Sequence, residues 1–212
     1  MLVPSTTLAG FAAVALAMVL TPGPNMAYLV SRTICQGRAA GLISLGGVGI
    51  GFVVYVLLAA FGITALLFAV PLAYDALRLA GAAYLGWMAW NALRPGGASP
   101  FQVRNLPVDS HRRLFSMGLL TSLLNPKVAA LYLSLLPQFV DPDGGHILGQ
   151  TVMLGATQIA ISLSINALIV MTSGAVSAFL QGRPFWTLVQ RWLMGTVLAG
   201  LAVRMAIDTS RR

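Results

Sequence analysis

Apolar residues fill six segments of this 212-residue chain, and each segment is long enough to cross a lipid bilayer as a helix. About 20 apolar residues span the ~30 Å hydrocarbon core, and an open sheet cannot do so because its edge groups stay unpaired in lipid. The pattern therefore predicts an all-α membrane protein with six transmembrane helices. We expect them at about residues 5–33, 40–61, 68–93, 114–138, 147–173 and 187–207. Only Gly62 and Pro71 mark the boundary between the second and third helices.

One hydrophilic linker, at about residues 94–113, divides the single integral membrane domain (1–212) into two halves. The first half covers about residues 1–93 and the second about 114–212. Because each half crosses the membrane three times, an odd number, the halves must have opposite orientations. The layout therefore predicts two inverted three-helix repeats, an arrangement that is typical of secondary transporters.

The first helix of each repeat contains a break. "TPGPN" (21–25) interrupts the first helix, and "NPK" (125–127) follows about eleven residues into the fourth. Eleven residues rise roughly 16 Å, about half of the hydrocarbon core, so both breaks are expected at mid-membrane. Asn favours the N-cap and Pro the first helical position. A new half-helix should therefore begin at Pro126, and another at either Thr21-Pro22 or Gly23-Pro24.

The restarted half-helices predict a binding site for a negatively charged group. Each helix N-terminus has free N–H groups and a partial positive charge, which bind anions such as a carboxylate. Lys127 adds a full charge at a depth where an unpaired ammonium costs about 2.5–3.5 kcal/mol. The bland alternatives are that the prolines only bend the helices and that Lys127 extends to the membrane interface. The predicted substrate-binding residues are Pro22, Gly23, Pro24, Asn25, Asn125, Pro126 and Lys127.

Charge places the chain in the membrane. Only 8% of residues are charged, against roughly 25% in soluble domains, so the net charge of +8 indicates orienting loop arginines, not nucleic-acid binding. With the N-terminus outside, the cytoplasmic loops hold Arg32, Arg38, Arg94, Arg104, Arg112, Arg113, Arg183 and Arg191. The positive-inside bias thus favours periplasmic termini. The arginine-bearing C-terminal tail leaves open a five-span or N-inside arrangement.

Other polar residues have two readings each. Asp75 either lies within the bilayer as a proton-coupling carboxylate or lies at the external end of the third helix, loosely paired with Arg78. Gln158, Ser162 and Asn166 form one stripe, at spacing i, i+4, i+8, which either lines a pathway or bonds neighbouring helices. Gly47 and Gly51 indicate close packing, within the bundle or at a homodimer seam.

The sequence offers no enzyme site, and we expect no cofactor and no metal. It contains no nucleophile–base pair, no phosphate-binding glycine loop and no Cys/His cluster. The histidines, His111 and His146, read as surface residues. Cys35 is the single cysteine and excludes an internal disulfide.

Two motifs carry a family resemblance over nearly the whole chain. "TPGPNMAYLVSRTICQGRAAGLISLGGVGIG" resembles the N-terminal signature of the LysE/RhtB family of amino-acid exporters, and "NPKVAALYLSLLPQFV" resembles its second-half motif. "LRLAGAAYLGWMAWNALR" is similar to its third helix. The resemblance implies a bacterial inner-membrane secondary transporter that exports amino acids or close derivatives, driven by the proton gradient. It also implies that the PGPN and NPK residues form the central motifs.

Together these patterns predict an amino-acid exporter that binds the substrate carboxylate between opposed half-helices near Asn25 and Asn125. Rocking of the two inverted halves would alternate access, with protons and the lipid bilayer as further partners. The alternatives are a small-solute channel and a small-cation exporter on the same scaffold, although a cation site would call for a carboxylate or thiolate. A lipid enzyme or scramblase would need a catalytic constellation or a hydrophilic groove.

Overall fold

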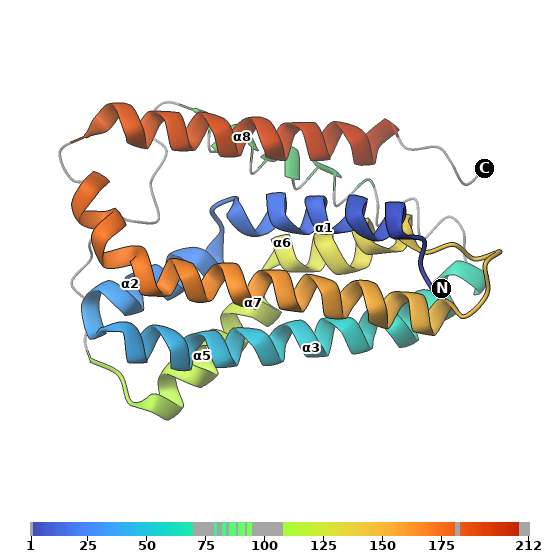
Figure 1. The fold of residues 1–212 in the computed structure, drawn as a ribbon, viewed down its shortest axis with the longest axis horizontal. Coiled ribbons are helices and arrows are strands. Elements are labelled where there is room, and N and C mark those ends of the chain that lie inside the picture. Colours follow the sequence, from blue (N-terminus) through green and yellow to red (C-terminus); the bar gives the residue numbers. More distant parts are fainter. Residues whose placement is uncertain are drawn as a thin grey trace.

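The computed structural model describes residues 2–69, 79, 82–83, 85–87, 89–91, 93–94, 108–180 and 183–207, and every regular element in this part of the chain is helical (Figure 1). The first half holds α1 (Ser5–Leu20), α2 (Pro24–Gln36) and α3 (Arg38–Ala69). The second half holds α5 (His111–Leu123), α6 (Pro126–Ala129), the π-helix η1 (Ala130–Leu135), the 3₁₀ helix η2 (Leu136–Phe139), α7 (Ile147–Leu180) and α8 (Pro184–Ile207).

Two helices and two bent helix pairs are apolar and long enough to cross a membrane, among the described residues. The single helices are the stretches Arg38–Gly62 of α3 and Ile147–Ala175 of α7. The pairs are α1 with α2, bent by 51°, and α5 with the segment Pro126–Phe139, bent by 50°. The prediction of an all-helical membrane protein is confirmed, with two to four candidate spans. The full six-helix inverted repeat stays a prediction.

Both breaks lie in the predicted segments, and the predicted spans 40–61 and 147–173 agree with the candidate spans Arg38–Gly62 and Ile147–Ala175, although both helices run further. α3 continues through Gly62 to Ala69, past the expected end at residue 61, because a glycine costs a helix only about 1 kcal/mol and no capping residue follows it. α7 likewise extends beyond residue 173, to Leu180. Most of the predicted third helix (68–93) lies outside the described residues, although its described residues from 79 onward are helical. α8 coincides with the predicted sixth helix but does not reach the hydropathy of a candidate span.

The two bent pairs run in opposite directions, side by side. The ring of Phe11, near the start of α1, packs edge-on against Phe139 at the end of η2, with centroids 5.2 Å apart. At the other end of the molecule, the side-chain amide of Gln36, in the last turn of α2, donates to the backbone carbonyl of Asp109 just before α5 (2.6 Å). The breaks therefore meet between these two contacts, well inside the bundle.

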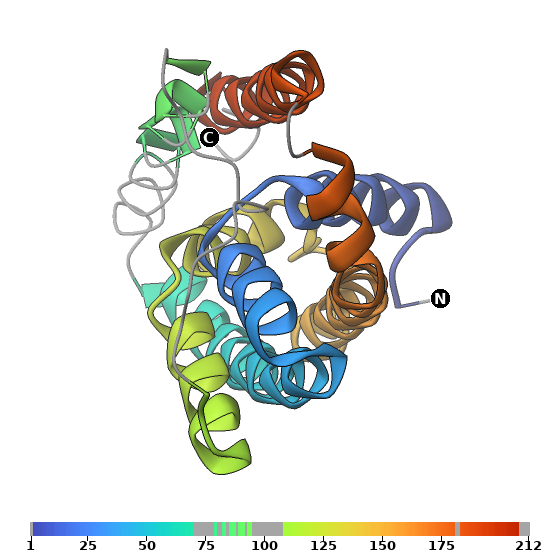
Figure 2. The ribbon, with the colours of Figure 1, turned by 90° about the vertical axis from the view of Figure 1, so that its left-hand side faces the viewer.

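Glycines bring α3 and α5 into close contact. A Cβ on Gly47 would lie 2.0 Å from the carbonyl oxygen of Phe115, and one on Gly51 would lie 2.6 Å from the Cβ of Ser122. Gly118 of α5 approaches Ser44 in the same way. The predicted glycine face is thus a packing face within the bundle. Figure 2, viewed along the bundle, shows α8 at its periphery, where it makes a few contacts with α1 and α7.

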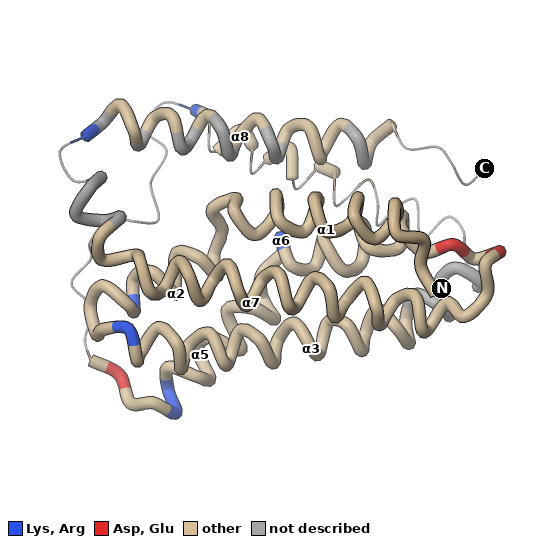
Figure 3. Tube along the Cα trace, in the orientation of Figure 1, with Lys and Arg blue, Asp and Glu red and all other residues tan. Residues whose placement is uncertain are grey.

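Most basic residues of the described chain lie toward one end of the bundle, together with Asp109, and two acidic residues lie at the other end. Figure 3 shows Lys and Arg toward the end where α2 meets α3, with one basic position near the middle, at α6. Asp141 and Asp143 lie at the other end, between η2 and α7. Arg32, expected in a loop, instead lies within α2 and is buried. It forms an ion pair with buried Asp109 (2.6 Å), which compensates both charges.

Candidate functional site

Two asparagines join the breaks directly. Asn125 is the N-cap of α6, and its Oδ1 accepts from the backbone N–H of Lys127 (3.0 Å). Its Nδ2 donates to the Oδ1 of Asn25 in the first turn of α2 (2.9 Å). The predicted restart at Pro126 is confirmed. Of the two starts considered in the first half, the Gly23-Pro24 alternative is correct, since α2 begins at Pro24 with Gly23 as its N-cap.

The ammonium of Lys127 points inward at this junction. Lys127 is only 9% exposed, and its Nζ donates to the carbonyl oxygen of Thr21, the residue that ends α1. Thr21 itself is fully buried, with its hydroxyl bonded to the carbonyl of Ala17 (2.7 Å). The alternative in which Lys127 extends to the membrane interface is therefore wrong.

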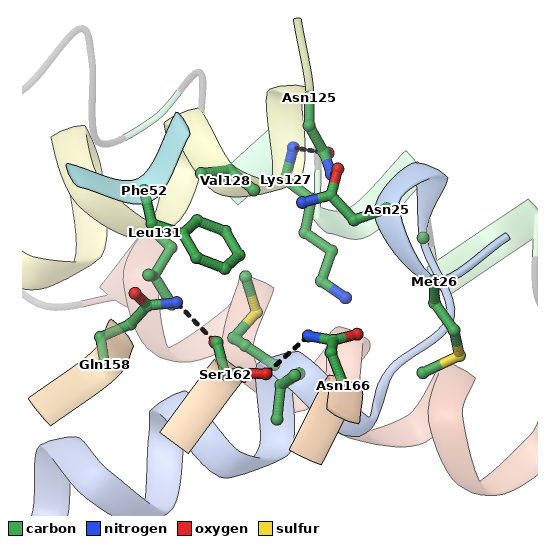
Figure 4. Close-up of a pocket in the computed structure, with 13 residues that line it drawn as sticks. Asn25, Met26, Phe52, Asn125, Lys127, Val128, Leu131, Gln158, Ser162 and Asn166 are labelled. Atoms are coloured by element: carbon green, nitrogen blue, oxygen red, sulfur yellow. Dashed lines mark hydrogen bonds between the residues drawn. The ribbon is translucent and has the colours of Figure 1, made fainter. Parts of the chain in front are cut away.

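A small, partly open cavity lies beside this junction. Figure 4 shows Lys127 and Asn25 on one side of it and the α7 residues Gln158, Ser162 and Asn166 facing them. Apolar side chains complete the lining: Met18, Val19, Met26, Phe52, Val128 and Leu131.

The α7 stripe is a buried hydrogen-bonded row. Gln158 donates from Nε2 to the Oγ of Ser162 (2.7 Å), and Asn166 donates from Nδ2 to the backbone carbonyl of Ser162 (2.8 Å). The hydroxyl of Tyr132, in η1, donates to the Oε1 of Gln158. All three stripe residues are at most 4% exposed and line the cavity. The stripe residues therefore fit both interpretations from the sequence, because they line the cavity and also form hydrogen bonds within the bundle.

Lys127 is the only charged side chain among the described residues that line the cavity, and it is also the only lysine of the chain. The helix N-termini of α2 and α6 add partial positive charge near it. The described part of the chain contains no group of His, Cys, Asp or Glu that could hold a metal ion. This arrangement can bind a small anion or zwitterion with an apolar body.

The structure brings together most, but not all, of the predicted site residues. Gly23, Asn25, Asn125 and Lys127 line the cavity with the α7 stripe, whereas Pro22, Pro24 and Pro126 shape the breaks without lining it. Asp75 lies outside the described residues. The surface prediction holds for His111 and His146, which are both exposed.

Sequence reasoning missed several residues of the site. Thr21 belongs to the "TPGPN" motif, and the break itself could have suggested a free carbonyl there, because helix C-termini leave such groups unpaired. Phe52, Leu131 and Tyr132 gave no comparable signal. They are apolar or aromatic residues in apolar helices, and only the packing of α3 and η1 brings Phe52 and Leu131 to the cavity and the hydroxyl of Tyr132 to Gln158.

Comparison with known proteins identifies the family. A family model described as "LysE type translocator" matches residues 16–209. A leucine efflux protein of Enterobacter sp. (strain 638) is 28% identical over 199 residues, which cover 89% of this chain and 90% of that protein. An uncharacterized membrane protein of Pseudomonas aeruginosa is 30% identical over 199 residues, 91% of each chain. A leucine efflux protein of Salmonella choleraesuis is 26% identical over 192 residues, again 91% of each.

No solved structure matches this chain. The match to the family model covers nearly all of the described helices, including both breaks and the α7 stripe. The chain belongs to the family of LysE type translocators and is a membrane transport protein, not an enzyme.

Proposed function

We propose that this protein exports neutral amino acids with aliphatic side chains, such as leucine, across the bacterial inner membrane. The observation that carries the proposal is the buried ammonium of Lys127 in a cavity that is otherwise apolar or uncharged among its described lining residues. The family supports translocation, and relatives of similar length carry the name leucine efflux protein.

The substrate carboxylate binds at the junction of the two breaks. Lys127 supplies the positive charge, and Asn25 has an Nδ2 that can donate while its Oδ1 accepts from Asn125. Hydrogen bonds to charged groups contribute roughly 1.5–3 kcal/mol each. The first turns of α2 and α6 add favourable dipoles.

The substrate side chain packs against the apolar part of the lining. Figure 4 shows Phe52 and Leu131 together on one side of the cavity. A buried aliphatic side chain gains about 1.5–3 kcal/mol by leaving water. A second positive charge on the substrate would meet Lys127 and no acidic side chain among the described lining residues, so basic amino acids should be rejected.

Transport uses alternating access between two inverted halves. The antiparallel bent pairs, whose breaks meet at the cavity, support this part of the proposal. The arginine-rich end faces the cytoplasm by the positive-inside rule, which puts the N-terminus in the periplasm. Export is coupled to proton entry, with Asp75 as the proposed carboxylate. An Asp75→Asn variant that keeps the pH dependence of transport would remove that role.

A channel and a small-cation exporter gain no support from the site. A cation would meet the ammonium of Lys127 in the same cavity. A channel for a small solute would show flux without saturation, whereas a transporter saturates with substrate.

The proposal is tested by leucine flux in proteoliposomes. Wild-type protein should transport radiolabelled leucine saturably, and Lys127→Met should abolish transport because it removes the only full positive charge among the described residues that line the cavity. The matched control is Arg38→Met, which removes an exposed basic residue at the start of α3. Absence of leucine transport by wild-type protein, or full transport by Lys127→Met, would contradict the proposal.

A further inference from the structure

One amide oxygen in the cavity has no hydrogen-bond donor among the described residues. Asn166 is 3% exposed, and its Nδ2 donates to the backbone carbonyl of Ser162. That bond fixes the orientation of the amide, and Oδ1 lies on the opposite side of it from Nδ2. Figure 4 shows this oxygen on the side of the cavity that Lys127 approaches.

The other side-chain oxygens around the junction are already engaged. Asn25 accepts from Asn125, Asn125 accepts from the backbone N–H of Lys127, and Gln158 accepts from Tyr132. The carbonyl of Thr21 accepts from the ammonium of Lys127. Of the amide oxygens that line the described cavity, the one on Asn166 is therefore left to accept a new bond.

An α-amino acid carries its ammonium one carbon away from its carboxylate. A site that holds the carboxylate near Lys127 must therefore also offer an acceptor to the ammonium, or leave that charge buried and unpaired. A carboxylate side chain there would also accept from the ammonium, but it would pair with Lys127 as well and so weaken the binding of every carboxylate. A neutral amide accepts from an ammonium without competing for Lys127.

We propose that Asn166 binds the ammonium group of the substrate and makes the transporter selective for α-amino acids over other carboxylates. This inference rests on the proposed function, since it assumes that Lys127 binds the carboxylate of the same molecule. In this arrangement the carboxylate of the substrate binds at α6, and its ammonium binds at α7.

The test compares leucine with 4-methylpentanoate, which is leucine without its amino group. Dissociation constants of both are measured on purified protein by competition against radiolabelled leucine. In wild-type protein, leucine should bind more tightly than 4-methylpentanoate. Asn166→Ala should raise the dissociation constant of leucine by about tenfold or more, as expected for the loss of one hydrogen bond to a charged group. The dissociation constant of 4-methylpentanoate should stay unchanged. The ratio of the two constants should therefore collapse.

A matched control and a second variant separate binding from folding. Ser173→Ala removes a buried side-chain bond on the same helix, from Oγ to the carbonyl of Val170 (3.1 Å), away from the cavity, and should keep the wild-type ratio. Asn166→Asp keeps an acceptor oxygen and should not lower the ratio. The ratio is measured within one variant, so it does not depend on the folded fraction, and Asn166→Asp carries the test if Asn166→Ala does not fold.

The outcomes distinguish the two proposals. Equal weakening of leucine and 4-methylpentanoate by Asn166→Ala, or a fall in the ratio for Asn166→Asp, would overturn the role of Asn166 while leaving leucine transport in place. Failure of wild-type protein to bind leucine at all would instead overturn the proposed function.

Discussion

At the scale of single residues, the site depends on how Lys127 is held. Its backbone N–H completes the N-cap of α6, and its ammonium reaches back to the carbonyl that ends α1. One residue thus contacts both broken helices. A charge buried in this way costs free energy, and the carbonyl of Thr21 offsets only part of that cost. Small changes in the space around the ammonium should therefore have large effects on the affinity for the substrate.

Gly23→Ala tests the space around the ammonium. The backbone of Gly23 is extended (φ −161°), so an alanine fits it without strain. Its Cβ, however, would lie 3.1 Å from the Cδ and 3.3 Å from the Nζ of Lys127. We expect leucine affinity to fall about tenfold, equivalent to ~1.4 kcal/mol, within the range for overpacked sites.

The measurement for Gly23→Ala is leucine binding to purified protein. Gly174→Ala on α7 is the matched control, because a Cβ there meets nothing within 4 Å. Unchanged leucine affinity in Gly23→Ala would show that the position of Lys127 is not critical.

Asn125→Asp separates the two bonds that Asn125 makes. An aspartate still caps α6 by accepting from Lys127, but it cannot donate to Asn25. Two oxygens would then face each other at the junction. We expect leucine transport to be lost while the helix cap is preserved, so thermal stability in detergent should fall less than in Asn125→Ala, which also loses about 0.5–2 kcal/mol of capping energy. Ser110→Ala, at the exposed cap of α5, should lower stability slightly and leave transport intact.

At the scale of elements, the sequence was most informative about the positions where the two helices are interrupted. Pro24 and Pro126 lack the N–H that a continuous helix needs, so the positions of both breaks could be predicted. The stripe of Gln158, Ser162 and Asn166 was also visible as a period of four. The end of α3 could not be predicted, because Gly62 in an apolar run neither caps nor stops a helix.

The partners of individual residues could not be predicted at all. Asp109 lies in a hydrophilic linker, and nothing local shows that it pairs with Arg32 in a helix 77 positions earlier. Phe52 reaches the cavity only because α3 packs beside the broken helices. Such contacts depend on how helices pack in three dimensions, and a pattern along one segment does not contain that information.

The contact between α3 and α5 should tolerate no side chain at Gly47. An added Cβ would lie 2.0 Å from the carbonyl oxygen of Phe115 and 2.8 Å from the backbone nitrogen of Leu119. Because backbone atoms cannot rotate away, Gly47→Ala should cost at least the ~1–3 kcal/mol typical of overpacking. Thermal unfolding in detergent measures this, with Gly62→Ala, further along α3 and open in space, as the control. Equal melting temperatures would contradict the close contact.

The ion pair between α2 and the start of the second half should contribute strongly to stability. Asp109 binds Arg32 at 2.6 Å and Arg113 at 3.1 Å, but the side chain of Arg113 is 67% exposed while that of Arg32 is 7% exposed. Asp109→Asn leaves the charge of Arg32 buried without its carboxylate, which typically costs about 3–5 kcal/mol. Arg113→Met removes only an exposed partner and should cost about 0–1 kcal/mol. Chemical unfolding of both variants checks this difference, and similar losses would show that the pair with Arg32 is not special.

At the scale of the whole molecule, the distribution of charge along the bundle predicts its orientation in the membrane. Basic residues gather at the end where α2 meets α3, and the acidic loop lies at the other end, beside the start of α1 (Figure 3). The broken helices meet between these ends. If the basic end faces the cytoplasm, substrate enters there and leaves past the contact between Phe11 and Phe139. The orientation of the bundle in the membrane therefore decides which end of the protein receives substrate from the cytoplasm.

Cysteine labelling tests this orientation. Cys35 is the only cysteine, so a Cys35→Ser background allows single cysteines to be placed at exposed positions on opposite ends. Asp143→Cys lies in the acidic loop and His111→Cys in the first turn of α5, beside Asp109. With the positive end in the cytoplasm, a membrane-impermeant maleimide should label Asp143→Cys in intact spheroplasts and His111→Cys only after permeabilisation. Retained leucine transport by both variants is the control for folding. The reverse labelling pattern would place the arginine-rich end in the periplasm and would contradict the proposed periplasmic N-terminus.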